Sequence, residues 1–323
     1  MAFSKTIKIS VTGAAGNIAY AFLFRLASGA VFGADVGIHL HLMERPEILM
    51  SLNGLEMELN DCCFPNLLSI TLTADLAAGM HQVDWAILIG AKPRRPGMER
   101  ADLLFGNAPI FVEQGRAIDH HANENVKVLV VGNPCNTNAS VLTEQCKRIN
   151  RRSIFAMTML DELRARYLLA DKVGCGVKDI EGVIIFGNHS PSQCLDPSWV
   201  TVKGKPLTDL IKLDWFENEF LPTLQHRGAS VIAARGASSA ASAAHGIVQT
   251  IRCIEGLEGD QPFSLGILSE GEYDSPKELV VSLPCFVKDG QVLVDTSRSW
   301  SKMMHDHGQK TYQELAFEYQ LLT

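Results

Sequence analysis

Short apolar runs alternate with stretches of helical periodicity through the first half of the chain. Four runs rich in Val, Ile and Leu lack the polar alternation of a half-exposed strand, at residues 7–13, 36–44, 83–91 and 126–134. Helical patterns lie between the first three of them, at 19–30 and 51–62. Strands without alternation are buried on both faces, which is typical of a parallel sheet covered by its crossover helices. We therefore expect an α/β architecture with a parallel sheet in this half.

The pattern changes after about residue 156. A long helical pattern at 161–174 is followed by expected strands at 181–189 and 200–207, an Ala/Ser-rich helix from about 229 to 251, and two antiparallel strands within 279–294. Asp289, Gly290 and Gln291 form a favourable hairpin turn between these last two strands. We expect two domains, at 1–156 and 157–323, the second of the α+β class.

Composition narrows the class of protein. The chain has 323 residues, of which 46% are hydrophobic and 20% charged, so it can bury a sizeable core. Its apolar runs are far too short to span a bilayer, and the first residues lead into a strand pattern without an apolar signal block. Eight scattered cysteines without a CxxC pair favour reduced thiols over a disulfide framework or a zinc site. A formal net charge of −7 disfavours a nucleic-acid partner. We expect a cytoplasmic protein that binds neither nucleic acid nor membranes.

A glycine turn follows the first apolar run. Gly13 and Gly16 lie between a buried strand and a helix, and Ala19 occupies the third small position. Such a turn lets backbone amides and a helix N-terminus approach a pyrophosphate, although taken alone it also fits an ordinary helix entry. Glu44 ends the next strand, where a carboxylate would accept hydrogen bonds from the ribose hydroxyls of NAD. Arg45 follows it and could bind the 2′-phosphate of NADP, but Glu44 would repel that phosphate, so we favour NAD.

A second constellation combines a carboxylate, a guanidinium and an imidazole. Asp161 and Arg164 are spaced i, i+3 at the start of a helical pattern, and His189 follows an apolar run. A surface ion pair and a buried core histidine would be the structural explanations. A carboxylate that binds one ring nitrogen, however, fixes the tautomer and stabilises the imidazolium, and the other nitrogen can then exchange a proton with a hydroxyl. The three residues together predict an acid–base site.

Six strings in fixed order resemble a known family. GAAGNIAYA, GMERADLL, VVGNPCNTNA, LDELRAR, GNHSPSQ and QHRGASVIAARGASSAASAA are similar to malate dehydrogenases of the cytosolic-type and related bacterial branch, within the lactate/malate dehydrogenase superfamily. The likeness extends over nearly the whole chain. It implies a Rossmann-type parallel-sheet domain followed by an α+β substrate-binding domain. It further implies reversible hydride transfer between (S)-malate and NAD⁺, an enzyme of the tricarboxylic acid cycle, and a homodimer formed through helices such as those at 51–62 and 229–251.

The resemblance also implies roles for individual residues. His189 would be the proton donor and acceptor, with Asp161 as its partner. Arg164 would bind the substrate carboxylate, Arg100 would polarise the carbonyl, and Arg94 would bind the second carboxylate, where lactate dehydrogenases carry glutamine. Asn133 would contact both substrate and cofactor. The implied cofactor-binding set is Gly13, Ala14, Gly16, Asn17, Ile18, Glu44, Asn107, Gln114, Val131 and Asn133.

The stretch GAKPRRPGMERADLL (residues 90–104) contains Arg94 and Arg100 together with Pro93, Pro96 and Gly97, which is typical of a hinged loop that closes over a substrate. Planar guanidinium groups bind carboxylates with two parallel hydrogen bonds, which suits a dicarboxylate held at both ends. Arg95 is expected to face solvent. Three departures from the family pattern are Glu44 in place of aspartate, LDELR in place of LDHNR, and SPSQ in place of SSTQ. The second is expected to affect only the helix surface.

Four alternatives remain at this point. A lactate or other 2-hydroxy acid dehydrogenase differs at the Arg94 position. A short-chain dehydrogenase needs a Tyr-x-x-x-Lys pair, and the one such spacing, Tyr273 to Lys277, contains a proline. A silent NAD-sensing module would bind the cofactor without turnover. His39 and His41 alternate on one strand face and could suggest a metal, but no third ligand has suitable spacing, so we expect them to be structural and expect no metal.

Overall fold

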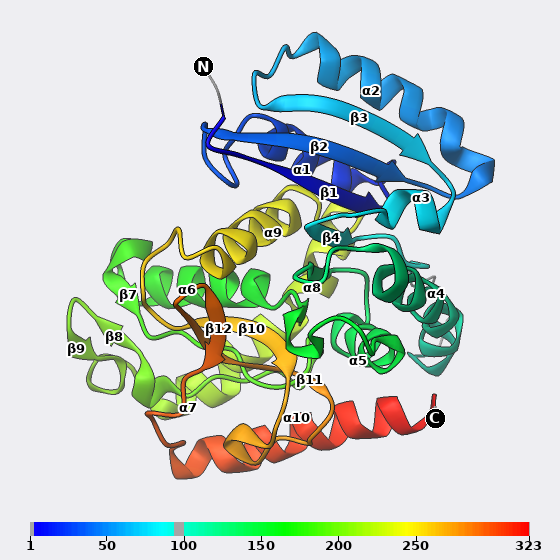
Figure 1. Ribbon diagram of the computed structural model, residues 1–323. Coiled ribbons are helices and arrows are strands. Elements are labelled where there is room, and N and C mark those ends of the chain that lie inside the picture. Colours follow the sequence, from blue (N-terminus) through cyan, green and yellow to red (C-terminus); the bar gives the residue numbers. More distant parts are fainter. Residues whose placement is uncertain (1–2, 94–99, 323) are drawn as a thin grey trace.

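The computed structural model describes residues 3–93 and 100–322, and its largest element there is one sheet of nine strands (Figure 1). The strands follow the order β12-β11-β10-β6-β5-β4-β1-β2-β3 across this sheet. Their bounds are β1 (Lys5–Thr12), β2 (Val36–Met43), β3 (Leu67–Thr73), β4 (Trp85–Leu88), β5 (Lys127–Val130), β6 (Ile154–Ala156), β10 (Phe263–Leu268), β11 (Val280–Lys288) and β12 (Gln291–Val294).

Strands β1 to β6 pair in parallel, which confirms the predicted Rossmann-type half. The apolar side chains of the central strands are buried on both faces, as their lack of alternation predicted. Strand β3 lies at the edge, has mostly half-exposed side chains, and was not expected from the sequence. The connecting helices are α1 (Asn17–Ala27), α2 (Leu52–Asp61), α3 (Leu76–Met80), α4 (Arg100–His121) and α5 (Cys135–Gln145).

The sheet continues into the second half of the chain with antiparallel strands. Strand β10 pairs with β6 where Gly266 lies opposite Ala156, and a Cβ atom added at Gly266 would meet the Ala156 Cβ at 2.6 Å. Strands β10, β11 and β12 then pair antiparallel. Asp289 and Gly290 connect the last two strands with φ of 52° and 75°, the left-handed values of a two-residue hairpin turn, so the predicted turn is confirmed.

The strand expected at 181–189 is wrong. Gly187 has a φ of 89°, which bends the segment, and it bonds to Ser282 only as an isolated bridge. The N–H of Ile185 donates to the side-chain Oγ of Ser264 on β10 at 2.9 Å rather than to a backbone carbonyl of that strand. The segment is therefore extended and apolar, as a strand would be, but its hydrogen bonds go to separate partners.

The single helix expected from about 229 to 251 is also wrong, because two helices occupy this stretch. Helix α8 (Leu221–Arg235) ends at Gly236, whose φ of 73° is the left-handed C-cap that glycine favours. Helix α9 (Ala241–Ile254) begins five residues later. Small residues continue through both helices, so composition alone did not mark the break.

The second half adds an outer layer around helix α6 (Met159–Val173). Its buried cluster includes Ala165 and Leu169 of α6 together with Phe216, Phe220 and Leu224. The other elements of this layer are β7 (Ile180–Glu181), β8 (Thr201–Val202), β9 (Lys205–Pro206) and α7 (Leu213–Trp215), with short helical turns at Val177–Asp179, Pro197–Trp199, Leu207–Asp209 and Phe216–Phe220. Elsewhere in the chain, further short turns lie at Pro46–Ser51, Arg151–Ser153 and Glu272–Asp274. The three short strands form a sheet of their own among the described residues.

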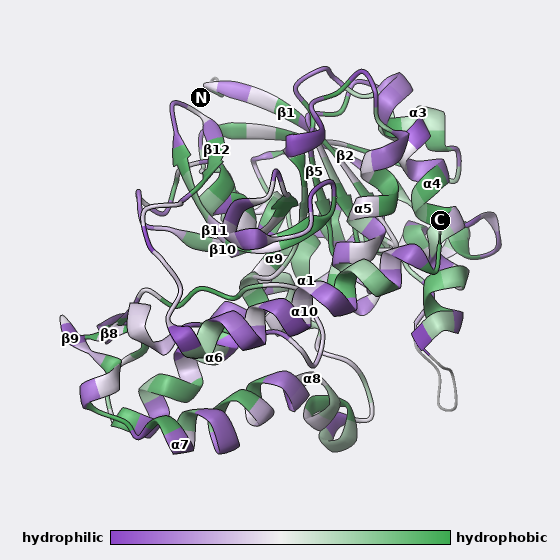
Figure 2. Cartoon of the chain, turned by 90° about the horizontal axis from the view of Figure 1, so that it is seen from below, coloured by the Kyte–Doolittle hydropathy of each residue, from purple (hydrophilic) through white to green (hydrophobic). Residues whose placement is uncertain are grey.

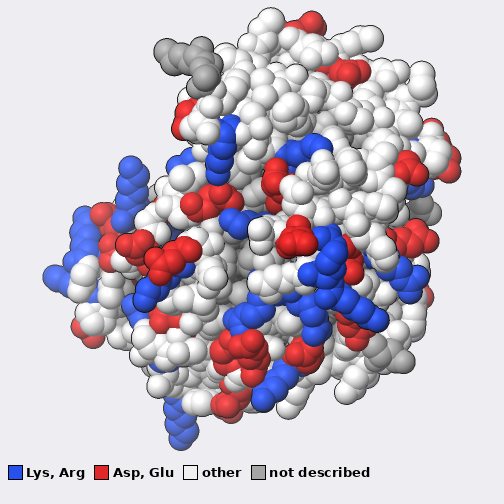
Figure 3. All heavy atoms as spheres, viewed as in Figure 1, with Lys and Arg blue, Asp and Glu red and all other residues white. Residues whose placement is uncertain are grey.

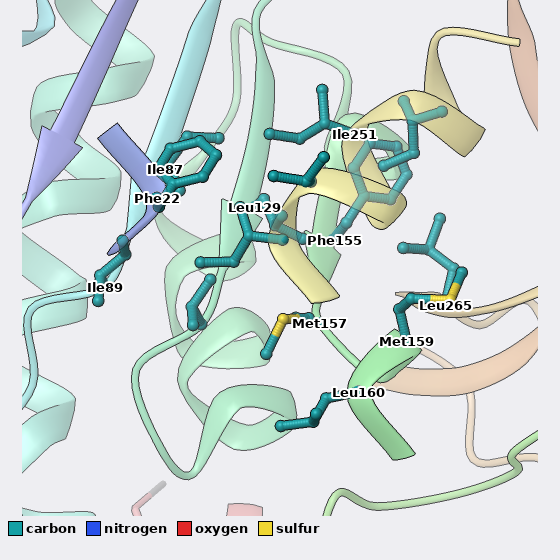
Figure 4. Packing of buried hydrophobic residues seen from close by; sticks show 14 of the residues in the cluster. Phe22, Ile87, Ile89, Leu129, Phe155, Met157, Met159, Leu160, Ile251 and Leu265 are labelled. Carbon is teal, nitrogen blue, oxygen red and sulfur yellow. The ribbon is translucent and has the colours of Figure 1, made fainter. Parts of the chain in front are cut away.

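The largest core fills the space between the sheet and helices α1 and α9. Phe22 and Ile251 from these helices point toward Ile87, Leu129 and Phe155 of the strands (Figure 4). All five side chains are buried, and burying each stabilises the fold by roughly 1.5–3 kcal/mol. A second cluster packs α4 and α5 against the opposite face. In Figure 2 the peripheral helices α6 and α7 carry both hydrophilic and hydrophobic colours, as helices with one buried face do.

Helix α10 (Lys302–Gln320) runs along the lower edge of the molecule, and its last turns lie by α5 and α4 (Figure 1). Ser301 caps its N-terminus by accepting the Met304 N–H at 3.3 Å. On the face drawn in Figure 3, Lys and Arg side chains are interspersed with Asp and Glu over the lower half. Positive and negative charges are therefore mixed on this face.

Candidate active site

The glycine turn lies at the carboxyl end of β1. Gly13 has a φ of 66°, and a Cβ atom there would lie 2.6 Å from the Gly90 Cα, so only glycine fits between β1 and the end of β4. Gly16 is the N-cap of α1 and provides no side-chain cap. The first amides of α1 therefore keep donors available for an anion, as a pyrophosphate site requires. Asn17 is exposed and Ile18 is half-buried at this helix start.

Glu44 lies beside this turn. The N–H of Ala14 donates to the Met43 carbonyl at 3.2 Å, which brings the end of β2 against the glycine turn. The Glu44 carboxylate is partly exposed and accepts a hydrogen bond from the Arg45 backbone at 3.0 Å. A carboxylate in this place can accept ribose hydroxyls, so the turn and Glu44 together fit a dinucleotide.

The turn after β5 forms another wall at the same edge of the sheet. Val131 is buried and donates its N–H to the Leu88 carbonyl at 2.9 Å. Asn133 has an exposed side chain and precedes a cis peptide bond to Pro134. Its exposed side chain can thus contact a ligand bound at this edge.

Asn107 and Gln114 lie on α4 and differ in how their amides are used. The Asn107 side chain accepts from the Lys92 N–H at 2.7 Å and donates to the carbonyls of Leu103 at 3.0 Å and Asn133 at 3.3 Å. It therefore braces the segment after β4 and the turn after β5 against α4. The Gln114 side chain is buried, and its Oε1 has no hydrogen-bond partner among the described residues.

His189, Asp161 and Arg164 form a contiguous cluster. The Asp161 carboxylate lies in the first turn of α6, where the helix dipole favours a negative charge, and it binds His189 Nδ1. Its other oxygen accepts from Arg164 Nη1 at 3.1 Å. The side chains of Asp161, Arg164 and His189 are 0%, 13% and 19% exposed. Spacing on α6 and the run before His189 had predicted this grouping.

The environment keeps Asp161 charged. Burial alone would raise the pKa of its carboxyl, but the charge and hydrogen bond of His189, together with Arg164, outweigh burial and hold the pKa below its usual range. The backbone of His189 is fixed separately, because its N–H donates to Asn136 Oδ1 at 2.9 Å. The imidazole is therefore held through one ring nitrogen and its own backbone.

Ser239 is a member of the cluster that the sequence analysis missed. Arg164 Nη2 donates to Ser239 Oγ at 3.2 Å, just before the start of α9. Arg164, Ser239 and His245 line a hollow of about 270 Å³ between α6, α8 and α9. The contact joins residues 75 positions apart, and no local spacing could have indicated it.

Arg100 is bound elsewhere. It begins α4, and its guanidinium pairs with Glu318 through Nε and lies 3.8 Å from Glu314 through Nη2, both on α10. Within the described residues it makes no hydrogen bond or ion pair with His189 or Asp161. Arg94 and Arg95, the other arginines of this stretch, lie outside the described residues.

The expectation that the LDELR departure affects only the helix surface is wrong. Glu162 is 2% exposed, and its carboxylate accepts from the Ser264 N–H at 2.7 Å and from Arg166 at 2.8 Å. Burial raises the pKa of its carboxyl despite these partners. Because α6 turns this position toward β10, the departure changes the packing behind Asp161.

Two alternative interpretations involve groups with structural partners. The Tyr273 hydroxyl donates to the Asp295 carbonyl at 2.6 Å, and its ring packs against Phe186 and Trp300. His39 Nδ1 lies 2.8 Å from Ser69 Oγ, and His41 Nδ1 lies 2.9 Å from the Gly79 carbonyl oxygen. Within residues 3–93 and 100–322, no three His, Cys, Asp or Glu side chains are grouped as metal ligands.

Both halves of the chain match family models. Residues 7–155 match the NAD binding domain of lactate/malate dehydrogenases, and residues 158–318 match their alpha/beta C-terminal domain. The chain belongs to the lactate/malate dehydrogenase family. It is thus an NAD-dependent oxidoreductase whose first half is the NAD-binding domain.

Solved structures of the family's two branches are similar to this dehydrogenase. Malate dehydrogenase from Naegleria fowleri is 39% identical with a TM-score of 0.94, covering 99% of this chain and 98% of that one. Lactate dehydrogenase of Trichomonas vaginalis, in complex with NADH and oxamate, is 32% identical with a TM-score of 0.93, covering 98% and 97%. Malate dehydrogenase from Plasmodium falciparum, at 21% identity and a TM-score of 0.82 with 97% of each chain covered, shares the fold.

Among the described residues of this dehydrogenase, no helix combines the length and the apolar composition that crossing a membrane requires.

Proposed function

We propose that the protein is a malate dehydrogenase that interconverts (S)-malate and oxaloacetate with NAD as the cofactor. The observation that carries the acid–base chemistry is the contact between His189 and the buried Asp161 carboxylate, which also binds Arg164. The choice of malate rests on Arg94 in the sequence and on the similarity to a malate dehydrogenase at 39% identity. The similarity to a lactate dehydrogenase at 32% identity keeps pyruvate as the competing substrate.

The chemistry of the proposed reaction divides between the residues of the cluster. Asp161 holds His189 through Nδ1, so the imidazole Nε2 is the atom that takes the proton from the malate hydroxyl or returns it to the carbonyl. The imidazolium that forms is stabilised by the Asp161 carboxylate, whose low pKa keeps it charged. Bound NAD supplies the hydride acceptor.

Binding of the substrate is assigned to arginine side chains. Arg164 donates one Nη hydrogen to Asp161 and another to Ser239. Its remaining N–H donors can bind a carboxylate through two parallel hydrogen bonds, as planar guanidinium groups do. Arg100 is proposed to polarise the carbonyl and Arg94 to bind the distal carboxylate, as the resemblance implies. Asn133 adds an amide at the end of β5.

NAD is proposed to lie across the carboxyl ends of β1, β2 and β5. Gly13, Ala14, Gly16, Asn17 and Ile18 would hold the pyrophosphate, and Glu44 the ribose. Val131 and Asn133 would border the nicotinamide half of the cofactor. Asn107 holds this turn in place by donating to the Asn133 carbonyl, and Gln114 on α4 has a buried Oε1 without a hydrogen-bond partner among the described residues. The segments 1–156 and 157–323 are proposed as the cofactor-binding and substrate-binding domains.

A crossed assay tests the function: purified protein with oxaloacetate or pyruvate, and with NADH or NADPH. Oxaloacetate with NADH should give the highest kcat/KM, and pyruvate should be disfavoured by about 10²-fold or more because it leaves a desolvated arginine unpaired. Faster turnover of pyruvate would assign the protein to the lactate branch. Cofactor binding without turnover of either acid would favour the alternative of an NAD-sensing module.

The preference for NADH over NADPH is expected to come from Glu44, because a carboxylate beside a phosphate dianion is repulsive. Glu44→Ser should therefore narrow the ratio of kcat/KM between the two cofactors. Equal values in the wild-type protein would instead assign the 2′-phosphate to Arg45.

A homodimer is proposed as the working assembly. Met57 on α2 and Ile232 on α8 are large apolar side chains that are 65% and 51% exposed, on the two regions that the resemblance implied for the interface. Light scattering after size-exclusion chromatography should give twice the mass of the 35.3 kDa chain. A mass of one chain would contradict this assembly.

A further inference from the structure

Glu318 is a buried carboxylate on α10 that joins three separate parts of the molecule. Its side chain is 3% exposed. One oxygen accepts from Arg100 Nε and, at 3.2 Å, from Asn188 Nδ2. The other oxygen accepts from Thr137 Oγ1 at 2.7 Å. Helix α10 thus binds the first residue of α4, the start of α5 and the loop that carries the imidazole.

Two of these partners lie next to groups that fix His189. Asn188 directly precedes His189, and Thr137 directly follows Asn136, whose Oδ1 accepts the His189 N–H at 2.9 Å. Asn136 also donates to the Gly187 and Val280 carbonyls at 3.4 Å and 3.0 Å. The Asn188 side chain therefore ties the segment just before His189 to the Glu318 carboxylate, and Thr137 joins the same carboxylate to α5.

The third partner brings the charge. A buried carboxylate requires a compensating cation, and Arg100 is the cation bound to Glu318. Because the guanidinium is planar, a bond at Nε fixes the plane in which the two Nη groups lie. Arg100 Nη2 is buried and has no hydrogen-bond partner among the described residues, and the Glu314 carboxylate lies 3.8 Å from it. The guanidinium is thus oriented along one edge and keeps donors uncommitted.

We propose that Glu318 is a positioning residue for the dehydrogenase reaction: it orients Arg100 and the His189 loop from one carboxylate, so that the arginine and the acid–base imidazole keep a fixed relation to each other. This rests on the proposed function, in which both groups act on the same carbonyl. Glu318 itself touches neither substrate nor cofactor in this assignment and acts only through its partners.

A double-mutant cycle separates this role from an ordinary structural ion pair. Glu318→Gln keeps the shape of the side chain and removes the charge that orients Arg100. It should lower kcat by about 10- to 100-fold, the cost of misplacing a catalytic group by about 1 Å, while the KM for NADH changes little. In an Arg100→Gln background the same substitution should lower kcat by less than about twofold, because no guanidinium is left to be oriented relative to the imidazole and a glutamine amide oxygen can still accept from Asn188. Multiplicative losses in the two backgrounds would overturn the proposal.

Thr137→Val provides the matched control, because it removes one hydrogen bond from the same carboxylate and leaves the Arg100 contact in place. It should lower Tm, because a single buried hydrogen bond contributes about 1 kcal/mol to stability. It should keep kcat within about twofold of wild type, because Arg100 and Asn188 stay bound to Glu318 and His189 stays bound to Asp161. A kcat loss as large as that of Glu318→Gln would show that any disturbance of this carboxylate slows turnover, and would overturn the proposal.

If Glu318→Gln does not fold, Glu318→Asp replaces it in the same cycle, since it keeps the charge and only shortens the side chain. The same dependence on Arg100 is expected for its smaller kcat loss, and independence from Arg100 would again overturn the proposal. The proposed function fails separately, when wild-type protein binds NADH by fluorescence but turns over neither oxaloacetate nor pyruvate. If the wild type turns over either acid but the kcat losses of the two substitutions multiply, the proposed role of Glu318 is wrong and the dehydrogenase function stands.

Discussion

Asp161 and Glu318 are two buried carboxylates that each bind an arginine, but their remaining partners differ. Asp161 also binds His189, the imidazole proposed to exchange a proton with the substrate hydroxyl. Glu318 binds Asn188 and Thr137, which do not titrate. Asp161 can therefore stabilise a positive charge that forms on its partner during the reaction, whereas Glu318 can only fix the positions of its partners. Burying a charged carboxylate costs free energy unless the charge is paired and hydrogen-bonded, so the partners of each carboxylate indicate its role.

The largest effect is expected when Asp161 loses its imidazole partner. His189→Asn removes the imidazole that Asp161 binds and should lower kcat by about 10²–10⁴-fold, because a general acid–base group is lost. Steady-state rates with oxaloacetate and NADH measure it, and NADH fluorescence checks that cofactor binding persists. A variant that retains more than a few per cent of the wild-type rate would exclude His189 as the base.

The next effect concerns the stretch just before Arg100. Arg94→Gln should lower kcat/KM for oxaloacetate and raise it for pyruvate, shifting the ratio by about 10²-fold, because the distal carboxylate loses its partner. Arg95→Gln is the matched control and should leave the ratio nearly unchanged. If Arg95→Gln changes the ratio instead, the assignment is off by one residue; if neither does, this stretch does not select the substrate.

A third experiment measures the charge on Asp161 through stability. Because the pKa of Asp161 lies below its value in the unfolded chain, the carboxylate stabilises the fold above that unfolded value, and this contribution is lost as pH falls through the folded-state pKa. Asp161→Asn should lower the free energy of unfolding by about 3 kcal/mol near pH 7 and by much less in acid. Urea denaturation at several pH values measures the difference. A difference that does not change with pH would show that Asp161 is not charged.

The smallest effect sharpens the comparison with a third buried carboxylate, Glu162. Burial raises its pKa, so the fold is most stable below the unfolded pKa of the group and loses stability as pH rises through the folded-state value. Glu162→Gln removes this loss and should gain stability relative to wild type as pH increases, with turnover retained. The opposite trend in urea denaturation would mean that the Arg166 and Ser264 contacts outweigh burial.

Local patterns in the sequence predicted the parts of the site that depend on neighbouring residues. The i, i+3 spacing placed Asp161 and Arg164 on one face of α6, and the glycine turn preceded α1 as expected. The contacts of Ser239 and Glu318 join residues 75 to 218 positions apart, so no periodicity could show them. Asp161 and Glu318 are chemically alike, and only the distance along the chain to their partners made one predictable.

The errors in the fold have a related cause. An apolar run indicates burial, but it does not show which partner takes each N–H, and the segment before His189 is buried without being a strand. A helical composition does not show where a left-handed glycine ends the helix, as Gly236 does. Glu162 was assigned to the surface because charged residues are usually exposed, and its burial depends on β10, a distant strand.

The pairing of Gly266 with Ala156 limits how the molecule can be divided. A cut between residues 156 and 157 would separate β6 from β10 and leave each with an unpaired row of backbone donors and acceptors in an otherwise hydrophobic sheet. Bare, flat edges of this kind promote self-association. The two halves therefore share one continuous sheet even though the sequence pattern changes between them. Either half expressed alone would expose a strand edge that favours aggregation.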